Sequence, residues 1–266
     1  MLHLGKEYPM RSQSSFAKYE LPLFLLLSYA LSWWSAPLMN GQILPHGPAF
    51  AALIVIALTR GRPGLREWWR RVTHWRIPVF WFIAGPLIII SYHAIAFVLN
   101  LLLGAELVSP PSLSTGMFIE LLLVGGLWEE PGWSGYLLPK MNERFANHPN
   151  GLLLAALVTG VFRCIWHVPL FLYGHIPWFD VFIFSFTFQL IIAWVFYRSG
   201  GSVPAVMVLH FVSNLMGSFT ARIFDGAEQT TYAALFMAAA TVFALALIWT
   251  SQFKTATPQE IPKQAW

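Results

Sequence analysis

The sequence of 266 residues has a single cysteine, Cys164, and few charged side chains. One cysteine excludes an intrachain disulfide, a thiolate metal cage and a redox-active CxxC pair. Charged residues make up 11% of the chain, whereas soluble domains carry about 25%. The shortage of charge therefore argues against an ordinary soluble enzyme.

Hydrophobic residues instead make up 57% of the chain, which contains 13 Trp and 22 Phe. The mean hydropathy of +0.59 excludes a disordered chain and indicates a membrane protein. The net charge of +4 comes from Lys and Arg in short segments between apolar runs. This distribution fits anionic lipid headgroups better than nucleic acid, so we predict the lipid bilayer as a partner and no nucleic acid.

Long uncharged runs define the predicted architecture, because a spanning helix needs about 20 mostly apolar residues. They predict an all-α, polytopic transmembrane helical bundle with about eight spans. No repeat or linker divides the chain, so we predict a single membrane domain over residues 1–266. The run 43–59 is short and contains Pro48, which leaves a re-entrant segment open there. The runs are 21–39, 43–59, 77–103, 115–138, 151–172, 180–197, 203–220 and 230–251.

The positions of Lys and Arg predict the orientation of these spans, because short cytoplasmic loops are rich in both residues. With the N-terminus in the cytoplasm, 14 of the 16 basic residues fall on the cytoplasmic side; the exceptions are Arg163 and Arg222. We therefore predict that both termini are cytoplasmic. Residues 66–76 combine Arg with three Trp at helical spacing, which is typical of an interfacial amphipathic segment, although a plain loop fits as well.

Ionisable residues inside the predicted spans are the strongest functional signal. A charged side chain at mid-bilayer costs about 2.5 to 3.5 kcal/mol, so such residues usually face the bundle interior and mark a site. Three predicted spans carry polar groups that can converge on one cavity. These groups are Glu129 and Glu130 in 115–138, Arg163 and His167 in 151–172, and His210 and Asn214 in 203–220.

Paired carboxylates with two histidines provide the groups for activating water. The activation can be direct, by general-base catalysis, or can proceed through a metal ion. Glu129, His167 and His210 are an accepted ligand set for zinc, and a metal-free mechanism is equally compatible with them. The alternatives are purely structural. Glu129 and Glu130 would belong to an ion pair that holds helices together, and Asn214 would bridge helices through hydrogen bonds.

Three segments resemble motifs of the type II CAAX prenyl protease family, which includes bacterial relatives associated with bacteriocin processing and immunity. EEPGWSGYLLP resembles its EExxxR motif, RCIWHVP its FxxxH motif and HFVSN its HxxxN motif. The motifs occur in the family's order over about residues 120–220. They place a family-like catalytic core at about residues 115–220.

The resemblance implies an intramembrane endopeptidase, a hydrolase that cleaves a peptide bond in a peptide or membrane-protein substrate. For this chain it implies that Glu129 activates water with support from Glu130 and that His167 orients that water. His210 and Asn214 would stabilise the oxyanion. It also implies an integral protein of the bacterial cytoplasmic membrane. Whether the enzyme is a zinc-dependent intramembrane metalloprotease is left open.

The sequence departs from these motifs at two positions. Ser134 stands where the first motif has Arg, and Arg163 stands where the second has Phe. Because an unpaired buried charge is strongly unfavourable, we predict that Arg163 pairs with Glu130 or Glu129 from the neighbouring helix. The alternative is a catalytically impaired membrane scaffold or bacteriocin-immunity protein that binds a peptide or partner helix.

Overall fold

The computed structural model describes residues 19–108, 114–123, 126–221 and 223–250, and every regular element within them is a helix. The predicted all-α membrane architecture is confirmed, because five of these helices are long and apolar enough to cross a bilayer. Two shorter apolar helices precede them, α1 (Glu20–Trp33) and α2 (Gly47–Thr59). Both termini lie outside the described residues. The five are α4 (Phe80–Leu102), α8 (Gly151–Leu172), η3 (Asp180–Phe184) continuing into α9 (Ser185–Arg198), α10 (Val203–Thr220) and α11 (Gly226–Trp249).

The first two predicted runs are helical over only part of their length. The run 21–39 is helical only to Trp33, and the chain then turns through Asn40 and Gly41, which both have positive φ. The run 43–59 is helical from Gly47, so Pro48 lies in the first turn of α2. Proline is tolerated there because its missing N–H has no partner within the helix. Pro48 therefore starts this helix.

The run 115–138 forms a series of short helices. It contains α5 (Thr115–Leu123), α6 (Gly126–Gly132) and η2 (Trp133–Leu137), and α7 (Leu138–Arg144) follows. Pro131 lies inside α6 and cannot donate to the preceding turn. The next five residues form a π-helix, the wider turn that is often found at functional sites. The helix irregularity thus directly follows Glu129 and Glu130.

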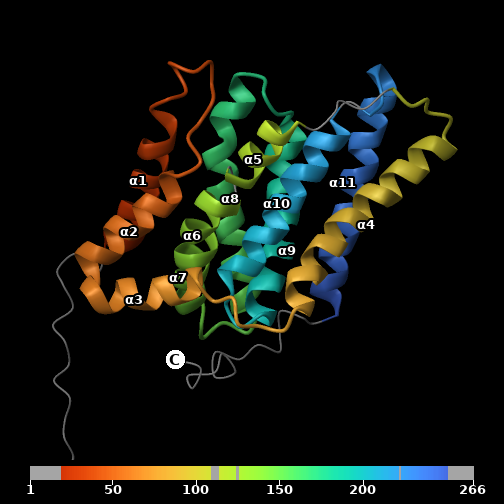
Figure 1. Ribbon diagram of the computed structural model, residues 1–266. Helices are drawn as coiled ribbons and strands as arrows, with labels where there is room; N and C mark the ends of the chain where they lie inside the picture. The colour runs from red at the N-terminus through yellow and green to blue at the C-terminus, as the bar shows by residue number, and fades with distance from the viewer. Residues whose placement is uncertain (1–18, 109–113, 124–125, 222, 251–266) are drawn as a thin grey trace, which may run out of the picture.

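The helices pack around a core that surrounds α6 and η2. Helices α1 and α2 lie on one side of the bundle and α4 and α11 on the other, with α8, α9 and α10 between them (Figure 1). Helix α6 packs against both α2 and α10, and η2 contacts α8 and α9. The fully buried side chains include Trp133, Leu137, Trp166, Ile191 and Leu209. The segment with the two glutamates is therefore central.

Helix α3 (Gly61–Val72) crosses the end of the bundle at which α7 and α9 also end (Figure 1). We call this the basic end, because it carries the arginines of α3 together with Arg144 and Arg198. Trp68 of α3 is buried, whereas Arg62, Arg66 and Arg70 are exposed. The part of the predicted amphipathic segment up to residue 72 is thus confirmed as an amphipathic helix.

Close contact between α2 and α6 depends on Gly132. A Cβ atom at this position would overlap the backbone of Pro48, which cannot move without displacing α2. We expect Gly132→Ala to destabilise the protein by about 1 to 3 kcal/mol, as overpacking in cores does. Gly217→Ala is the control, because a Cβ atom at Gly217 meets no atom within 4 Å in the described structure. Thermal unfolding in detergent measures both; equal midpoints would contradict the prediction.

Candidate functional site

Glu130 is the centre of a buried network that joins three segments of the chain. Arg163 of α8 donates from Nη2 to Oε1 over 2.8 Å, and His210 of α10 donates from Nδ1 to the same oxygen over 2.7 Å. Ser134 of η2 donates its hydroxyl to Oε2. The Glu130 side chain has no exposed surface. Both carboxylate oxygens are therefore occupied by protein donors.

Arg163 forms the ion pair that the sequence predicts. Besides its contact with Glu130, its Nη1 atom lies 4.0 Å from Oε2 of Glu129. Its guanidinium also lies over the ring of Trp133, 5.8 Å from the centroid. The side chain is 1% exposed, so water contributes almost nothing to its solvation. One buried cation thus faces two buried carboxylates.

Glu129 differs from Glu130 in its bonding, although both are buried. Its Oε2 atom has no hydrogen-bond partner among the described residues. The residue is 5% exposed, whereas Glu130 has no exposure. A carboxylate with an unoccupied oxygen can accept a proton from a bound water, whereas the oxygens of Glu130 already accept hydrogen bonds. Of the two carboxylates, Glu129 is the one available for proton transfer.

His167 and Asn214 lie in the same region of α8 and α10 but outside the bonded network. His167 is half-buried and donates from Nδ1 to the backbone carbonyl of Arg163 over 2.8 Å, which leaves Nε2 as the nitrogen that can face a ligand. Asn214 is half-buried, one turn after His210, and makes no hydrogen bond to another described residue. The structure thus brings Ser134, Arg163 and His210 onto Glu130. Among the described residues, His167 and Asn214 form no hydrogen bond or ion pair with either glutamate.

A shared metal centre does not fit this arrangement. Among the described residues, no three His, Cys, Asp or Glu side chains lie together in a group that could hold a metal ion. Glu129, His167 and His210, for which zinc is predicted, are accordingly not gathered as a tetrahedral ligand set would be. Zinc binding stays a prediction, which activity measurements in the presence of a chelator can test.

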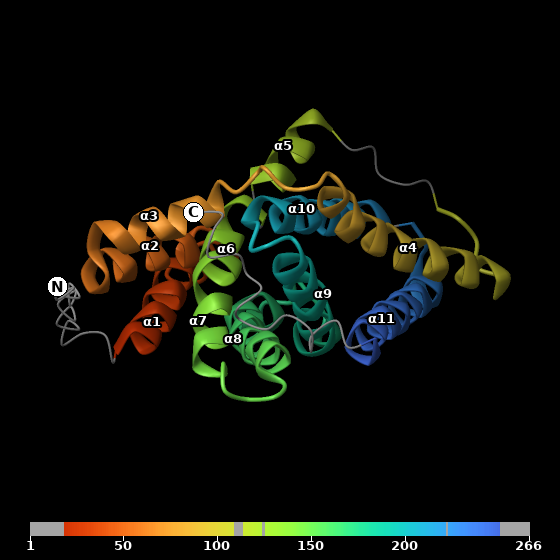
Figure 2. The ribbon, with the colours of Figure 1, turned by 90° about the horizontal axis from the view of Figure 1, so that it is seen from below.

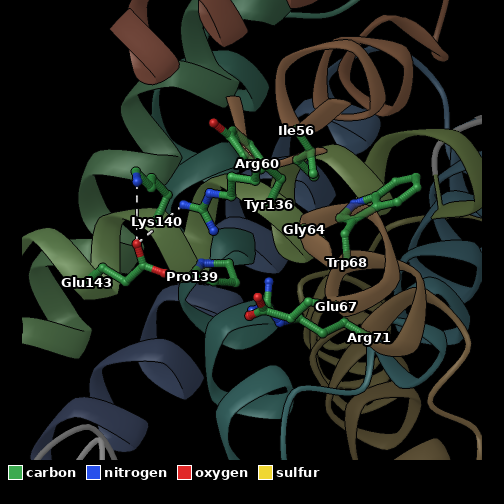
Figure 3. A pocket seen from close by; sticks show the side chains of 10 residues that line it. All are labelled: Ile56, Arg60, Gly64, Glu67, Trp68, Arg71, Tyr136, Pro139, Lys140 and Glu143. Atoms are coloured by element: carbon green, nitrogen blue, oxygen red, sulfur yellow. Dashed lines mark hydrogen bonds and ion pairs between the residues drawn. The ribbon is translucent and has the colours of Figure 1, made fainter. Parts of the chain in front are cut away.

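Two residues of α3 support the backbone beside the site, and the sequence motifs do not include them. Trp68 donates from Nε1 to the carbonyl of Pro131 over 2.8 Å, and Arg71 donates from Nη1 to the carbonyl of Gly135 over 3.3 Å. Both side chains line a pocket together with Tyr136 of η2 and Lys140 of α7 (Figure 3). The amphipathic pattern of residues 66–76 identifies this helix, but it does not reveal that these carbonyls are its partners.

Known proteins match this chain over the region that contains the network around Glu130. Residues 111–216 match the family described as type II CAAX prenyl endopeptidase Rce1-like. The chain is also similar to CAAX prenyl protease 2 of Methanococcus maripaludis, with 27% identity over 106 residues. That match covers 36% of this chain and 37% of the relative's length. The resemblance predicted from the three motifs is confirmed over the part of the chain that contains the network.

Proposed function

We propose that this chain is an intramembrane endopeptidase of the CAAX protease type, which hydrolyses a peptide bond with water activated by side chains. One observation carries the proposal: residues of all three motifs meet in a single buried network, next to a carboxylate that has an oxygen without a partner. A purely structural ion pair would need Glu130 and Arg163 but would give no reason for the second buried carboxylate, Glu129.

In this mechanism Glu129 is the general base. Its free oxygen accepts a proton from the attacking water, and Arg163, 4.0 Å away, balances the charge of the carboxylate. His167 orients the water through Nε2, because its other ring nitrogen is held by a backbone carbonyl. A fixed orientation of both groups reduces the entropy lost when the reacting atoms come together.

His210 and Asn214 are proposed to stabilise the oxyanion that forms when water attacks the carbonyl carbon. Glu130 fixes the imidazole of His210 by accepting from Nδ1, so that Nε2 faces the site and donates when the ring carries both protons. Asn214 adds an amide donor from the same helix face, four residues later. Donors aimed at a developing negative charge are often the largest single contribution to catalysis.

The proposed setting is a bacterial cytoplasmic membrane, crossed about eight times with both termini in the cytoplasm. This topology counts α1, α2 and the broken helix from α5 to α7 as crossings, in addition to the five long helices. It is supported by the gathering of arginines at the basic end. The proposed substrate is a peptide or another membrane protein, since the site lies among apolar helices.

The experiment that tests the proposal is cleavage of a quenched peptide library by detergent-purified protein. We expect cleavage by the wild type and a decrease of about 100-fold in His167→Ala, because loss of a positioned acid-base group typically lowers rates by that factor or more. The chelator-treated wild type is measured in parallel, and loss of activity with recovery on adding zinc would favour metal dependence. A folded wild type that binds library peptides without cleaving any would favour a non-catalytic scaffold.

A further inference from the structure

Helix α3 carries a row of arginines that take no part in the packing of the bundle. Arg62, Arg66 and Arg70 follow one another at intervals of four residues, so they lie along one face over about 12 Å. All three side chains are exposed, and none forms an ion pair with another described residue. We call this row the arginine stripe. It concentrates positive charge that no described acidic group neutralises.

The opposite face of α3 packs against the rest of the protein. Gly64 and Trp68 are buried, and their positions lie about 200° around the helix from the arginine stripe. Glu67, which is the one acidic residue of the helix, is bonded to Arg71. Glu67, Trp68 and Arg71 line a pocket together with residues of η2 and α7 (Figure 3). Glu67 also borders the surface hollow beside the arginine stripe, where three arginines outnumber this one carboxylate.

The location of α3 identifies what this surface meets. The helix lies along one edge of the bundle, beside α2, when the molecule is viewed from the basic end (Figure 2). Trp69 is 59% exposed and follows Trp68 on the helix. Exposed tryptophans and arginines on a helix that crosses the ends of apolar helices are typical of the headgroup region of a bilayer. Trp69 and the arginine stripe on α3 match this composition.

We propose that the arginine stripe of α3 is a binding site for the phosphodiester headgroup of an anionic glycerophospholipid. Arg62, Pro63, Arg66, Glu67 and Arg70 line a surface hollow of about 310 Å³. Small-molecule sites have volumes of about 300 to 1,000 Å³, so the hollow has room for a headgroup. Guanidinium groups bind phosphate oxygens in bidentate geometry. The proposal does not depend on peptidase activity.

Binding at this site stabilises the helix break beside Glu130. The inner face of α3 donates hydrogen bonds to the carbonyls of Pro131 and Gly135. A lipid that holds the outer face in place therefore also holds the donors that support η2. A ligand that binds the folded state alone raises the unfolding midpoint, and the stabilisation grows with the logarithm of the ligand concentration above its Kd. Anionic lipid is thus expected to protect the folded protein in detergent.

The test is thermal unfolding of the full chain in a neutral detergent, titrated with phosphatidylglycerol, phosphatidylcholine or inorganic phosphate. Cys164 is the only cysteine of the chain and is buried, so a thiol-reactive fluorophore reports the unfolding of α8 directly. We expect phosphatidylglycerol to raise the midpoint of the wild type, and phosphatidylcholine and free phosphate to leave it unchanged. An equal effect of phosphatidylcholine or of free phosphate would overturn the assignment to an anionic lipid.

Substitutions of arginines test whether the effect of the lipid arises at the arginine stripe. The triple variant Arg62→Gln/Arg66→Gln/Arg70→Gln is expected to weaken the apparent affinity for phosphatidylglycerol roughly 100-fold, at about fivefold for each arginine near an anionic surface. Arg144→Gln is the matched control, because Arg144 is exposed at the same end of the bundle but lies on α7. If the triple variant does not fold, the three single variants replace it, each with an expected fivefold loss. An unchanged affinity in these variants, or an equal loss in Arg144→Gln, would overturn the proposal.

Discussion

Replacement of Glu129 by Gln is expected to lower the peptidase rate by about 10³ to 10⁴-fold while the protein stays folded. The substitution keeps the shape of the side chain and removes the proton acceptor, and general-base catalysis contributes up to about 10⁴-fold. Stability changes little because Oε2 of Glu129 has no hydrogen-bond partner to lose among the described residues. The cleavage rate of the quenched peptide and the thermal midpoint of the same preparation measure the two effects.

The equivalent change at Glu130 separates the roles of the two carboxylates. Glu130→Gln removes the negative charge that pairs with the buried Arg163 at 2.8 Å. It also replaces one of the two oxygens that accept from His210 and Ser134 with an amide nitrogen, which cannot accept. Breaking a buried pair typically costs about 3 to 5 kcal/mol, so we expect poor accumulation and a lowered midpoint. Wild-type activity in the Glu129→Gln variant would exclude Glu129 as the general base. A stable Glu130→Gln protein would exclude the structural role of the network.

Arg163→Phe is expected to be the most destabilising single change in the site. It restores the residue of the family motif but leaves Glu129 and Glu130 as two buried carboxylates without a cation. The expected loss is about 3 to 5 kcal/mol, because an uncompensated buried charge remains. The protein is expected to accumulate poorly in membranes and to show a lowered unfolding midpoint in detergent.

The double variant Arg163→Phe/Ser134→Arg is expected to recover part of that loss. Ser134 is fully buried and its hydroxyl bonds Oε2 of Glu130, so a guanidinium at this position approaches the same carboxylate from η2. Ser134→Arg alone is the control, since it adds a second cation to a site that Arg163 already neutralises. Equal destabilisation in Arg163→Phe and in the double variant would contradict the idea that the two departures from the motifs compensate each other.

The sequence by itself was sufficient for the class of fold and for naming the residues that meet around Glu130. Apolar runs are a property of the chain, and the ends of α8 and α10 agree with the runs 151–172 and 203–220. That Arg163 pairs with Glu130 or Glu129 also followed from the sequence, because a buried cation needs an anion and the motifs contain these two candidates. The breaks within 115–138 were less predictable, since hydropathy does not distinguish a straight helix from one with a π-helical turn.

Only the tertiary structure showed how the two neighbouring glutamates differ in their contacts. Glu129 and Glu130 are adjacent and equally acidic, and what separates them is contact with residues that are 33 and 80 positions away from Glu130 in the chain. The same applies to Trp68, whose partner Pro131 is 63 residues away. The sequence determined that these ionisable groups lie within apolar segments, because apolar runs can be recognised in the chain itself. The packing of α3, α8 and α10 against the broken helix decided which carboxylate oxygen has no hydrogen-bond partner. Hydrogen bonds form only over distances of a few ångströms, and the local sequence pattern does not show which distant segments come that close.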